Sequence, residues 1–309
     1  MRLSGNLLKM VLVTGGAGFI GSHVCEELLA KGEKVRALDN LASGKRSNLE
    51  GLNVEFTEGD IRSDSDLDGA MHDVDAVIHL AAEPSVTKSV EEPIATHEVN
   101  YTGTLRVLEA MRRAGVKRIV YASSAAVYTP NSDEPHTEDS APDPSSPYGM
   151  DKLAGEFALR GYGRLHGFQP TALRFFNIYG ERQDPASPYS GVISIFARRI
   201  TEGQPLKIFG DGQQSRDFVY VKDLAALIVR LLRDTAAPGL MNVGKGQSAT
   251  LLDLVAALEK ATGKQATVEH AEPRSGDIRV SRAGVERLHT YGATQWTPLE
   301  EGLAKLVAA

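Results

Sequence analysis

The chain has 309 residues, 42% of them hydrophobic and 24% charged, which is typical of a folded protein long enough for one large domain and a smaller one. Its formal net charge of −6 argues against nucleic acid as a partner, and no apolar run approaches the roughly 20 residues of a membrane helix. Cys25 is the only cysteine and the N-terminus carries no signal-like apolar segment, so we expect a cytoplasmic protein without intrachain disulfides.

Glycines interrupt the apolar run that begins at Val11. The stretch Thr-Gly-Gly-Ala-Gly-Phe-Ile-Gly (14–21) predicts a strand, a tight turn and a helix over 19–31. Gly16, Gly18 and Gly21 match the G-x-G-x-x-G spacing, in which free backbone N–H groups and the helix dipole attract a pyrophosphate. The sequence therefore predicts a dinucleotide-binding turn.

A second strand is predicted over 34–39 and ends at Asp39, 18 residues after Gly21. An acid near this position typically accepts hydrogen bonds from the adenosine ribose, which favours NAD. Arg36, Lys45 and Arg46 keep open the alternative that a 2′-phosphate, and hence NADP, is bound instead.

Strands alternate with helices along the first half of the chain. Further strands are predicted over 53–57, 76–80, 118–122 and 173–176, with a helix over 94–114, and this alternation indicates a Rossmann-type, doubly wound parallel sheet of the α/β class. Open sheets of this kind bind ligands at the carboxyl ends of their strands. We therefore expect Asp60 and Ile61 to flank the adenine and Leu80 to Ala82 to line the pyrophosphate channel.

Ser146 and Pro147 mark the start of a helix, which places Tyr148 and Lys152 one turn apart on one face. An ammonium group beside a phenol lowers the pKa of the phenol, so Tyr148 is a candidate catalytic base. Ser124 follows the preceding strand and is suited to hydrogen-bond the same substrate hydroxyl, with Ser123 as the alternative.

Beyond residue 176 the alternation becomes irregular. We expect an NAD-binding domain over 1–176 and a smaller substrate domain over 177–309, with residues 215–235, a strand and a helix, returning to the first domain. Helices are predicted over 191–201, 251–261 and 298–307, and a strand over 206–209. The eight histidines show no metal-ligand spacing, so no metal is expected.

Six motifs together resemble the extended short-chain dehydrogenase/reductase family, and within it the NAD-dependent nucleotide-sugar epimerases. They are Thr-Gly-Gly-Ala-Gly-Phe-Ile-Gly (14–21), His-Leu-Ala-Ala (79–82), Ser-Ser-Ala-Ala-Val-Tyr (123–128), Tyr148 with Lys152, Arg-Phe-Phe-Asn-Ile-Tyr-Gly (174–180) and Ser-Arg-Asp-Phe-Val-Tyr-Val-Lys-Asp (215–223). The resemblance implies permanently held NAD, a tyrosine base and a UDP-sugar in the cleft between two domains. It also implies a homodimer formed through a four-helix bundle, for which helices 94–114 and 148–166 are the candidates.

The resemblance assigns individual site residues. It implies that Asn177 contacts the sugar or diphosphate, that Phe209 stacks near the uracil, that Arg216 and Arg274 clamp the phosphates and that Asp277 holds the uridine ribose. The cofactor-binding positions are Gly15, Gly18, Phe19, Ile20, Gly21, Asp39, Asn40, Ser43, Gly44, Asp60, Ile61, Leu80, Ala81, Ala82, Asn100, Tyr148, Lys152 and Phe175. The substrate-binding positions are Ser85, Val86, Ser124, Asn177, Gly191, Val192, Phe209, Arg216, Arg274, Asp277 and Ser281.

The reaction and its substrate are expected from residues that differ among members of this family. Related 4,6-dehydratases carry an Asp-Glu pair where Ala125 and Ala126 stand, so a plain 4-epimerase is expected. Ser281 occupies the position at which a bulky aromatic residue restricts relatives to glucose and galactose, and the segments 181–185 and 187–190 resemble epimerases of UDP-N-acetylhexosamines. We expect interconversion of UDP-GlcNAc and UDP-GalNAc, in polysaccharide biosynthesis. A UDP-glucose 4-epimerase, a net oxidoreductase and a non-catalytic NAD(P)-sensing protein stay open as alternatives.

Overall fold

A computed structural model describes residues 8–130, 135–185, 191–273, 278–293 and 295–308 of the chain. These residues form two compact units, each built from separate stretches of sequence. The first unit comprises residues up to Tyr128, Ala141–Arg174 and Ala225–Met241. The second comprises Thr129–Ser140, Phe175–Leu224 and Asn242 onward.

The first unit is built on a sheet of seven strands in the order β11-β6-β5-β4-β1-β2-β3. The ladders that join β1 to β2, β1 to β4, β2 to β3 and β4 to β5 are parallel, so the carboxyl ends of these strands meet at one edge. This arrangement confirms the predicted Rossmann-type α/β fold. The strands are β1 (Val11–Thr14), β2 (Val35–Asp39), β3 (Glu55–Glu58), β4 (Ala76–His79), β5 (Arg118–Ser124), β6 (Gln169–Phe175) and β11 (Leu240–Val243).

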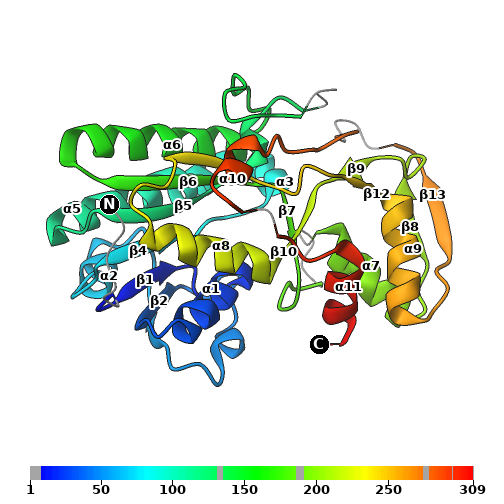
Figure 1. The fold of residues 1–309 in the computed structure, drawn as a ribbon, viewed down its shortest axis with the longest axis horizontal. Coiled ribbons are helices and arrows are strands. Elements are labelled where there is room, and N and C mark those ends of the chain that lie inside the picture. Colours follow the sequence, from blue (N-terminus) through cyan, green and yellow to red (C-terminus); the bar gives the residue numbers. More distant parts are fainter. Residues whose placement is uncertain (1–7, 131–134, 186–190, 274–277, 294, 309) are drawn as a thin grey trace. The chain divides into compact units, whose positions relative to one another are not determined.

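Helices cover both faces of this sheet. Figure 1 shows α5 and α6 along one face and α1 and α8 along the other. The helices are α1 (Phe19–Ala30), α2 (Asp64–Ala70), α3 (Val86–Glu91), α4 (Pro93–His97), α5 (Gly103–Ala114), α6 (Pro147–His166) and α8 (Val221–Arg233), with short turns η1 (Arg46–Leu49), η2 (Glu98–Thr102) and η3 (Ala125–Val127). The helix predicted over 94–114 is α4 and α5 joined by the π-helical turn η2.

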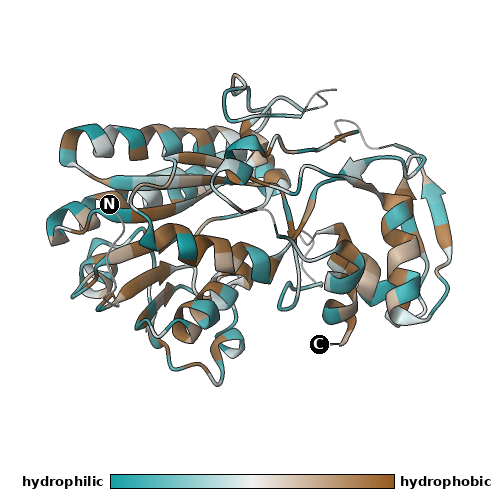
Figure 2. Ribbon diagram, in the orientation of Figure 1, coloured by the Kyte–Doolittle hydropathy of each residue, from teal (hydrophilic) through white to brown (hydrophobic). Residues whose placement is uncertain are grey.

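The core of the first unit lies between the sheet and its helices. Every residue of β1 and β4 is buried, as expected for strands covered on both faces. Leu12, Val77 and Ile119 of the strands pack in one cluster with Leu108 and Met111 of α5. Figure 2 shows β1 as a hydrophobic strand within this unit.

The second unit contains three short pairs of strands. They are β7 (Asn177–Tyr179) with β10 (Phe218–Tyr220), β8 (Leu206–Phe209) with β13 (Val268–Ala271), and β9 (Ser215–Arg216) with β12 (Ala249–Thr250). The helices are α7 (Val192–Thr201), α9 (Leu251–Thr262), α10 (Glu286–Thr290) and α11 (Leu299–Ala308). The fully buried Asp217 carboxylate accepts hydrogen bonds from the backbone N–H groups of Lys245, Gly246 and Ala283 at 2.7–3.2 Å, and so joins distant segments of this unit.

The predicted return of residues 215–235 to the first sheet is wrong for the strand. Residues 218–220 form β10, which pairs with β7, and the edge of the seven-stranded sheet is occupied instead by β11. The first unit regains the chain at Ala225, within α8. The units also differ from the expected boundaries in that residues 129–140 belong to the second unit.

None of the helices in the described ranges is both long and apolar enough to cross a membrane.

Candidate active site

The glycine turn between β1 and α1 is closely packed. Gly15 has φ +70°, and a Cβ there would lie 2.8 Å from the backbone nitrogen of Ala81, while a Cβ on Gly21 would lie 2.0 Å from the carbonyl oxygen of Gly15. Gly18 is the N-cap residue of α1, and no side chain caps the helix there. The turn therefore places uncapped backbone N–H groups and the positive end of a helix dipole at the carboxyl edge of the sheet, an arrangement that fits a pyrophosphate.

Asp39 ends β2 beside this turn. Its carboxylate accepts hydrogen bonds from the backbone N–H groups of Ala17 at 3.0 Å and Leu41 at 2.8 Å. Burial raises the pKa of Asp39, and these backbone hydrogen bonds oppose the rise. A Cβ on Gly44 would lie 2.9 Å from both carboxylate oxygens. Because residue 44 is a glycine, no side chain at this position crowds the carboxylate. Asp39 is thus held where the ribose of a bound dinucleotide is expected.

Two of the three cations that left NADP open, Arg36 and Arg46, have partners within the chain. The buried Arg36 donates from Nε to Glu55 at 2.6 Å and from one terminal nitrogen to the carbonyls of Ala70 and His72. The Arg46 guanidinium lies over the Phe56 ring, 3.9 Å from its centroid. Arg36 therefore serves to join β2, β3 and the end of α2, a role that its position in the sequence did not reveal.

The remaining cofactor candidates lie at or next to the carboxyl ends of strands. The Asn40 side chain donates to Asp60 at 3.0 Å, and Arg62 holds Asp60 through two hydrogen bonds that lower the pKa of its carboxyl group strongly. Asn100 uses both ends of its amide to hold the backbone of Glu83. Phe19 and Ile20 begin α1, Ser43 and Gly44 follow β2, Ile61 follows β3, Leu80 to Ala82 follow β4, and Phe175 ends β6.

Tyr148, Lys152 and Ser124 come together in the first unit. Ser146 caps α6 by accepting the N–H of Gly149 at 3.2 Å, so the helix starts where the sequence predicted. Lys152 lies one turn after Tyr148, with its Nζ 5.7 Å from the centroid of the Tyr148 ring. Ser124, the last residue of β5, lies close enough to the Tyr148 hydroxyl to favour its ionised form. Phenol, ammonium and alcohol are therefore neighbours, as a proton-transfer site requires.

Burial dominates the electrostatics of this group. It raises the pKa of Tyr148, opposite to the expected lowering, and the nearby Ser124 side chain opposes that rise. Burial also lowers the pKa of Lys152 to about 8, while the neighbouring Asp151 carboxylate favours the charged form. The Lys152 ammonium donates to the carbonyl oxygen of Ala122 at 2.8 Å.

A buried histidine lies beneath the same edge of the sheet. The two ring nitrogens of His79 hydrogen-bond Thr14 at 2.7 Å and Thr104 at 3.0 Å, and Thr104 donates in turn to the carbonyl of Asn100. Burial lowers the pKa of His79 to about 3, with the nearby Lys152 adding to the effect. His79 is therefore neutral at physiological pH and joins β1, β4 and the helix that carries Asn100.

Ser123 and Ser124 have different partners. Ser123 is buried and donates its hydroxyl to Glu156 at 2.5 Å, and Glu156 is paired through both oxygens with Arg174. Glu156 is not among the site residues predicted from the sequence. Its signal was present in the helical phase, because Glu156 follows Lys152 by one turn on the face that carries Tyr148.

The substrate candidates of the second unit gather around β9. The N–H of Ser281 donates to the carbonyl of Ser215 at 3.1 Å, so Ser281 lies beside the strand that carries Arg216. The side chain of Gln214 donates to the carbonyl of Phe209 at 2.8 Å, which brings the end of β8 to the same strand. One terminal nitrogen of Arg216 donates to the carbonyls of Ser215 and Ile278.

The other substrate candidates are placed singly. Asn177 begins β7, and Gly191 precedes Val192 at the start of α7. In the first unit Ser85 caps α3 by accepting the N–H of Lys88 at 2.9 Å, and Val86 is the first residue of that helix. Arg274, Asp277 and the segment 187–190 lie outside the described residues.

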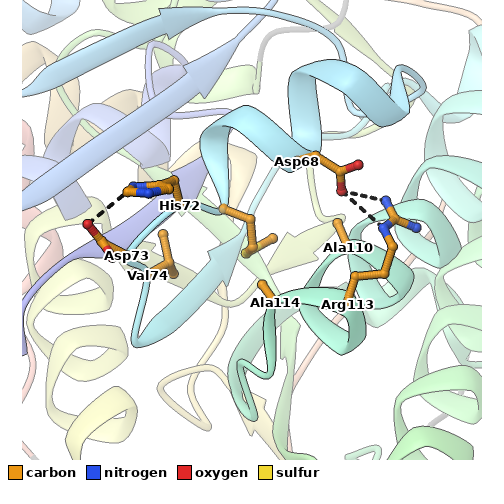
Figure 3. A pocket seen from close by; sticks show the side chains of 8 residues that line it. Asp68, His72, Asp73, Val74, Ala110, Arg113 and Ala114 are labelled. Atoms are coloured by element: carbon orange, nitrogen blue, oxygen red, sulfur yellow. Dashed lines mark hydrogen bonds and ion pairs between the residues drawn. The ribbon is translucent and has the colours of Figure 1, made fainter.

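A surface pocket of about 470 Å³ lies elsewhere in the first unit, where α2 and α5 end. Figure 3 shows Asp68 paired with Arg113 at one side of it and His72 beside Asp73 at the other. Because helices run antiparallel to the strands they follow, these helix ends belong to the amino edge of the sheet, opposite the glycine turn. Across the described part of the chain, no group of three or more His, Cys, Asp or Glu residues is arranged to hold a metal ion.

Comparison with known proteins gives concordant matches along the chain. Residues 11–244 match the model of the NAD dependent epimerase/dehydratase family. A UDP-glucose 4-epimerase of Mycolicibacterium smegmatis is 39% identical over 306 residues, covering 96% of each chain. The crystal structure of Thermus thermophilus UDP-glucose 4-epimerase in complex with NAD has a TM-score of 0.90 at 39% identity, covering 97% of this chain and 98% of that one. UDP-N-acetylglucosamine 4-epimerase from Methanobrevibacter ruminantium, in complex with UDP-N-acetylmuramic acid, has a TM-score of 0.91 at 36% identity and covers 98% of both chains.

Proposed function

Because the chain belongs to the NAD dependent epimerase/dehydratase family, we propose that it interconverts UDP-GlcNAc and UDP-GalNAc through a transient 4-keto sugar. NAD-dependent 4-epimerisation of a UDP-sugar is the activity that the family and the relatives support. The observation that carries the proposal for this chain is the contact of Tyr148 with Ser124, one turn from Lys152, in the unit that carries the glycine turn.

The cofactor is NAD, and the residues present fit it. The uncapped N-terminus of α1 at the glycine turn would hold the pyrophosphate, and Asp39 at the end of β2 would hold the adenosine ribose. When bound, NAD accepts a hydride from C4 of the sugar and returns it to the opposite face of the ketone, so no net oxidation occurs. We further propose that NAD stays bound through the reaction cycle, and that the protein purifies with it.

The chain's own residues move the proton. In the phenolate form Tyr148 takes the proton from the sugar 4-hydroxyl and later returns it to the ketone oxygen, acting as base and then as acid. Ser124 orients that oxygen through its hydroxyl. Lys152 supplies a positive charge one turn away that favours the phenolate, against the opposing effect of burial. Replacement of Tyr148 by Phe should abolish turnover and leave nucleotide binding intact, and a near-normal rate would refute the assignment.

The preference for an acetylated sugar rests on Ser281. A serine at this position leaves room that a bulky aromatic residue would fill, and the match to a UDP-N-acetylglucosamine 4-epimerase agrees with it. The names of several other relatives favour the alternative, a UDP-glucose 4-epimerase.

The substrate test compares kcat/KM for UDP-GlcNAc and UDP-glucose in the wild type and in Ser281→Tyr. We expect kcat/KM of the wild type for UDP-GlcNAc to be at least as high as for UDP-glucose. Ser281→Tyr should lose activity on UDP-GlcNAc while keeping activity on UDP-glucose. Val280→Tyr introduces the same side chain one residue away and serves as the control. A wild type that converts only UDP-glucose would favour the alternative.

We also propose that the protein is a homodimer formed through the helices over 94–114 and 148–166. Exposed apolar side chains lie on these elements, at Ile94 (80% exposed), Phe157 (56%) and Leu165 (78%). Light scattering after size exclusion should give twice the monomer mass, and Ile94→Asp should give a monomer while Leu252→Asp on α9 should not. A monomeric wild type would refute the proposal.

A cytoplasmic location is proposed on separate grounds. The chain has a single cysteine, Cys25, which is buried, and so has no intrachain disulfide that an oxidising compartment would favour. Fractionation of cells that express the tagged protein would test it, and recovery outside the cytoplasmic fraction would refute it.

A further inference from the structure

A buried ion pair lies directly behind the catalytic group. Glu156 on α6 and Arg174 on β6 are each 3% exposed at the side chain and are joined by two hydrogen bonds, from Arg174 Nε at 2.9 Å and from a terminal nitrogen at 2.7 Å. The Ser123 hydroxyl adds a third hydrogen bond to the same carboxylate, at 2.5 Å. Three elements that are distant in sequence, β5, α6 and β6, are thereby fixed to one carboxylate.

Short stretches of chain connect this carboxylate and its Ser123 partner to Tyr148 and Ser124. Ser123 precedes Ser124 at the end of β5, and Glu156 follows Tyr148 by two turns of α6. Ser123 and Ser124 are joined by a single peptide bond. A shift of Ser123 therefore also moves Ser124. The hydrogen bond from Ser123 to Glu156 therefore sets the end of β5 against the helix that presents Tyr148.

A second link acts on the same two elements. The Lys152 ammonium donates to the carbonyl of Ala122 at 2.8 Å and lies 5.2 Å from the centroid of the Tyr121 ring. Lys152 is a member of the catalytic group, whereas Ser123 and Glu156 make their contacts away from it. The link from Ser123 to Glu156 can thus be removed without touching the reacting residues.

We propose that Glu156, held by Arg174, is a positioning residue that acts through Ser123 to keep Ser124 in register with Tyr148. The inference rests on the proposed function for the roles of Ser124 and Tyr148, and goes beyond it by assigning a task to a carboxylate that is buried against Arg174. A purely structural ion pair would stabilise the unit without affecting the phenol.

The alternative structural role predicts a different pattern of effects. Arg174 contacts both oxygens of Glu156, so the ion pair survives the loss of the serine hydroxyl. Ser123→Ala therefore removes one hydrogen bond to a charged group and should fold. If the role is positioning, Ser124 moves away from Tyr148, and the pKa of Tyr148 rises because the nearby Ser124 side chain normally lowers it.

The matched control is Thr171→Val. Thr171 is fully buried on β6 and accepts a hydrogen bond at 3.0 Å from Arg118, at the opposite end of β5. Like Ser123→Ala, this variant removes one hydroxyl that contacts a buried charged side chain. The contact that it removes lies far from the catalytic group along β5. Both variants should lower Tm by a similar amount.

The primary measurement is a spectrophotometric pH titration of the Tyr148 phenol in the NAD-loaded protein. The signal of Tyr148 is isolated by subtracting the spectrum of the same protein with Tyr148→Phe. Ser123→Ala should raise the pKa of Tyr148 by about half a unit or more, Ser123→Thr should restore it, and Thr171→Val should leave it unchanged. Equal pKa values in the wild type and Ser123→Ala would overturn the proposal, and Ser123→Cys replaces Ser123→Ala if the latter does not fold.

Turnover provides the second readout. Ser123→Ala should lower kcat about tenfold with little change in KM, because misplacement of reacting groups is expressed in the chemical step. A loss of Tm with unchanged kcat and unchanged phenol pKa would leave only a structural role and refute the inference. Because the titration needs no turnover, a wild type inactive on every UDP-hexose would refute the proposed function while the titration still decides the role of Glu156.

Discussion

The carboxylate of Asp39 should decide the choice between NAD and NADP, and Asp39→Asn tests this directly. Asp39 is 8% exposed and is held by the N–H groups of Ala17 and Leu41. The asparagine keeps one oxygen that can accept from the backbone, so the glycine turn should persist. What the substitution removes is the negative charge.

The size of the effect follows from the charge. A 2′-phosphate in place of the ribose hydroxyl would bring like charges to roughly 4 Å, where two unit charges repel by about 4 kcal/mol at an effective dielectric constant near 20. Halving this value for access of solvent leaves about 2 kcal/mol, or roughly a 30-fold difference in affinity. Of the cations that could compensate, Arg36 is bound to Glu55 and Arg46 lies over Phe56.

The assay is titration calorimetry of protein stripped of its cofactor, with NAD and NADP in turn. Asp39→Asn should lower the ratio of the dissociation constant for NADP to that for NAD about 30-fold relative to the wild type. Glu58→Gln removes one charge from the neighbouring strand and should leave the ratio unchanged. A ratio that Asp39→Asn does not alter would refute the reasoning and reassign the discrimination to other groups.

Three further substitutions have defined outcomes. Between about pH 8 and 10.5, Lys152 is protonated in the unfolded chain but not in the folded chain, so the free energy of unfolding should rise with pH by up to about 3 kcal/mol. Denaturant titrations at several pH values should show this rise in the wild type, and Lys152→Met should remove it. Gly155→Ala places a Cβ 2.4 Å from the buried Tyr121 hydroxyl, and we expect the free energy of unfolding to fall by about 1 kcal/mol after the gain in helix propensity is counted. Adding Tyr121→Phe to this variant should recover part of the loss, and equal stability of the wild type, the single variant and the double variant would contradict this. Asp217→Ala leaves three buried N–H groups unpaired and should cost about 3 kcal/mol in urea denaturation, whereas a loss below about 1 kcal/mol would show that water replaces the carboxylate.

Local patterns were sufficient to predict much of the first unit. The glycine turn, Asp39 at the end of β2 and the helical phase of Tyr148 and Lys152 depend on residues close in sequence, and the structure has each of them in the predicted element. The edge strand β11 was missed because four residues between turns carry little periodicity, and its place is set by pairing with a distant strand. The strand 218–220 was misassigned for the same reason, since its partner β7 could not be read from its own residues.

Contacts across the sequence account for what could not be predicted in the site. Ser123 and Glu156 are 33 residues apart, and nothing in the serine pair indicates which of the two is occupied by an internal carboxylate. Arg36 looked available to a phosphate until folding buried it against Glu55. The pKa of Tyr148 was expected to fall because of Lys152, but the burial that raises it arises from packing that the local pattern does not contain.

The most direct test of the central claim is the fate of the hydrogen on C4 of the sugar. UDP-GlcNAc carrying deuterium at C4 is incubated in ordinary water with purified protein and no added cofactor, and the product is analysed by proton NMR and mass spectrometry. We expect UDP-GalNAc that keeps the deuterium at C4, because the hydride leaves and returns within one active site. Product that has exchanged the label with solvent, or no product from this sugar, would contradict it.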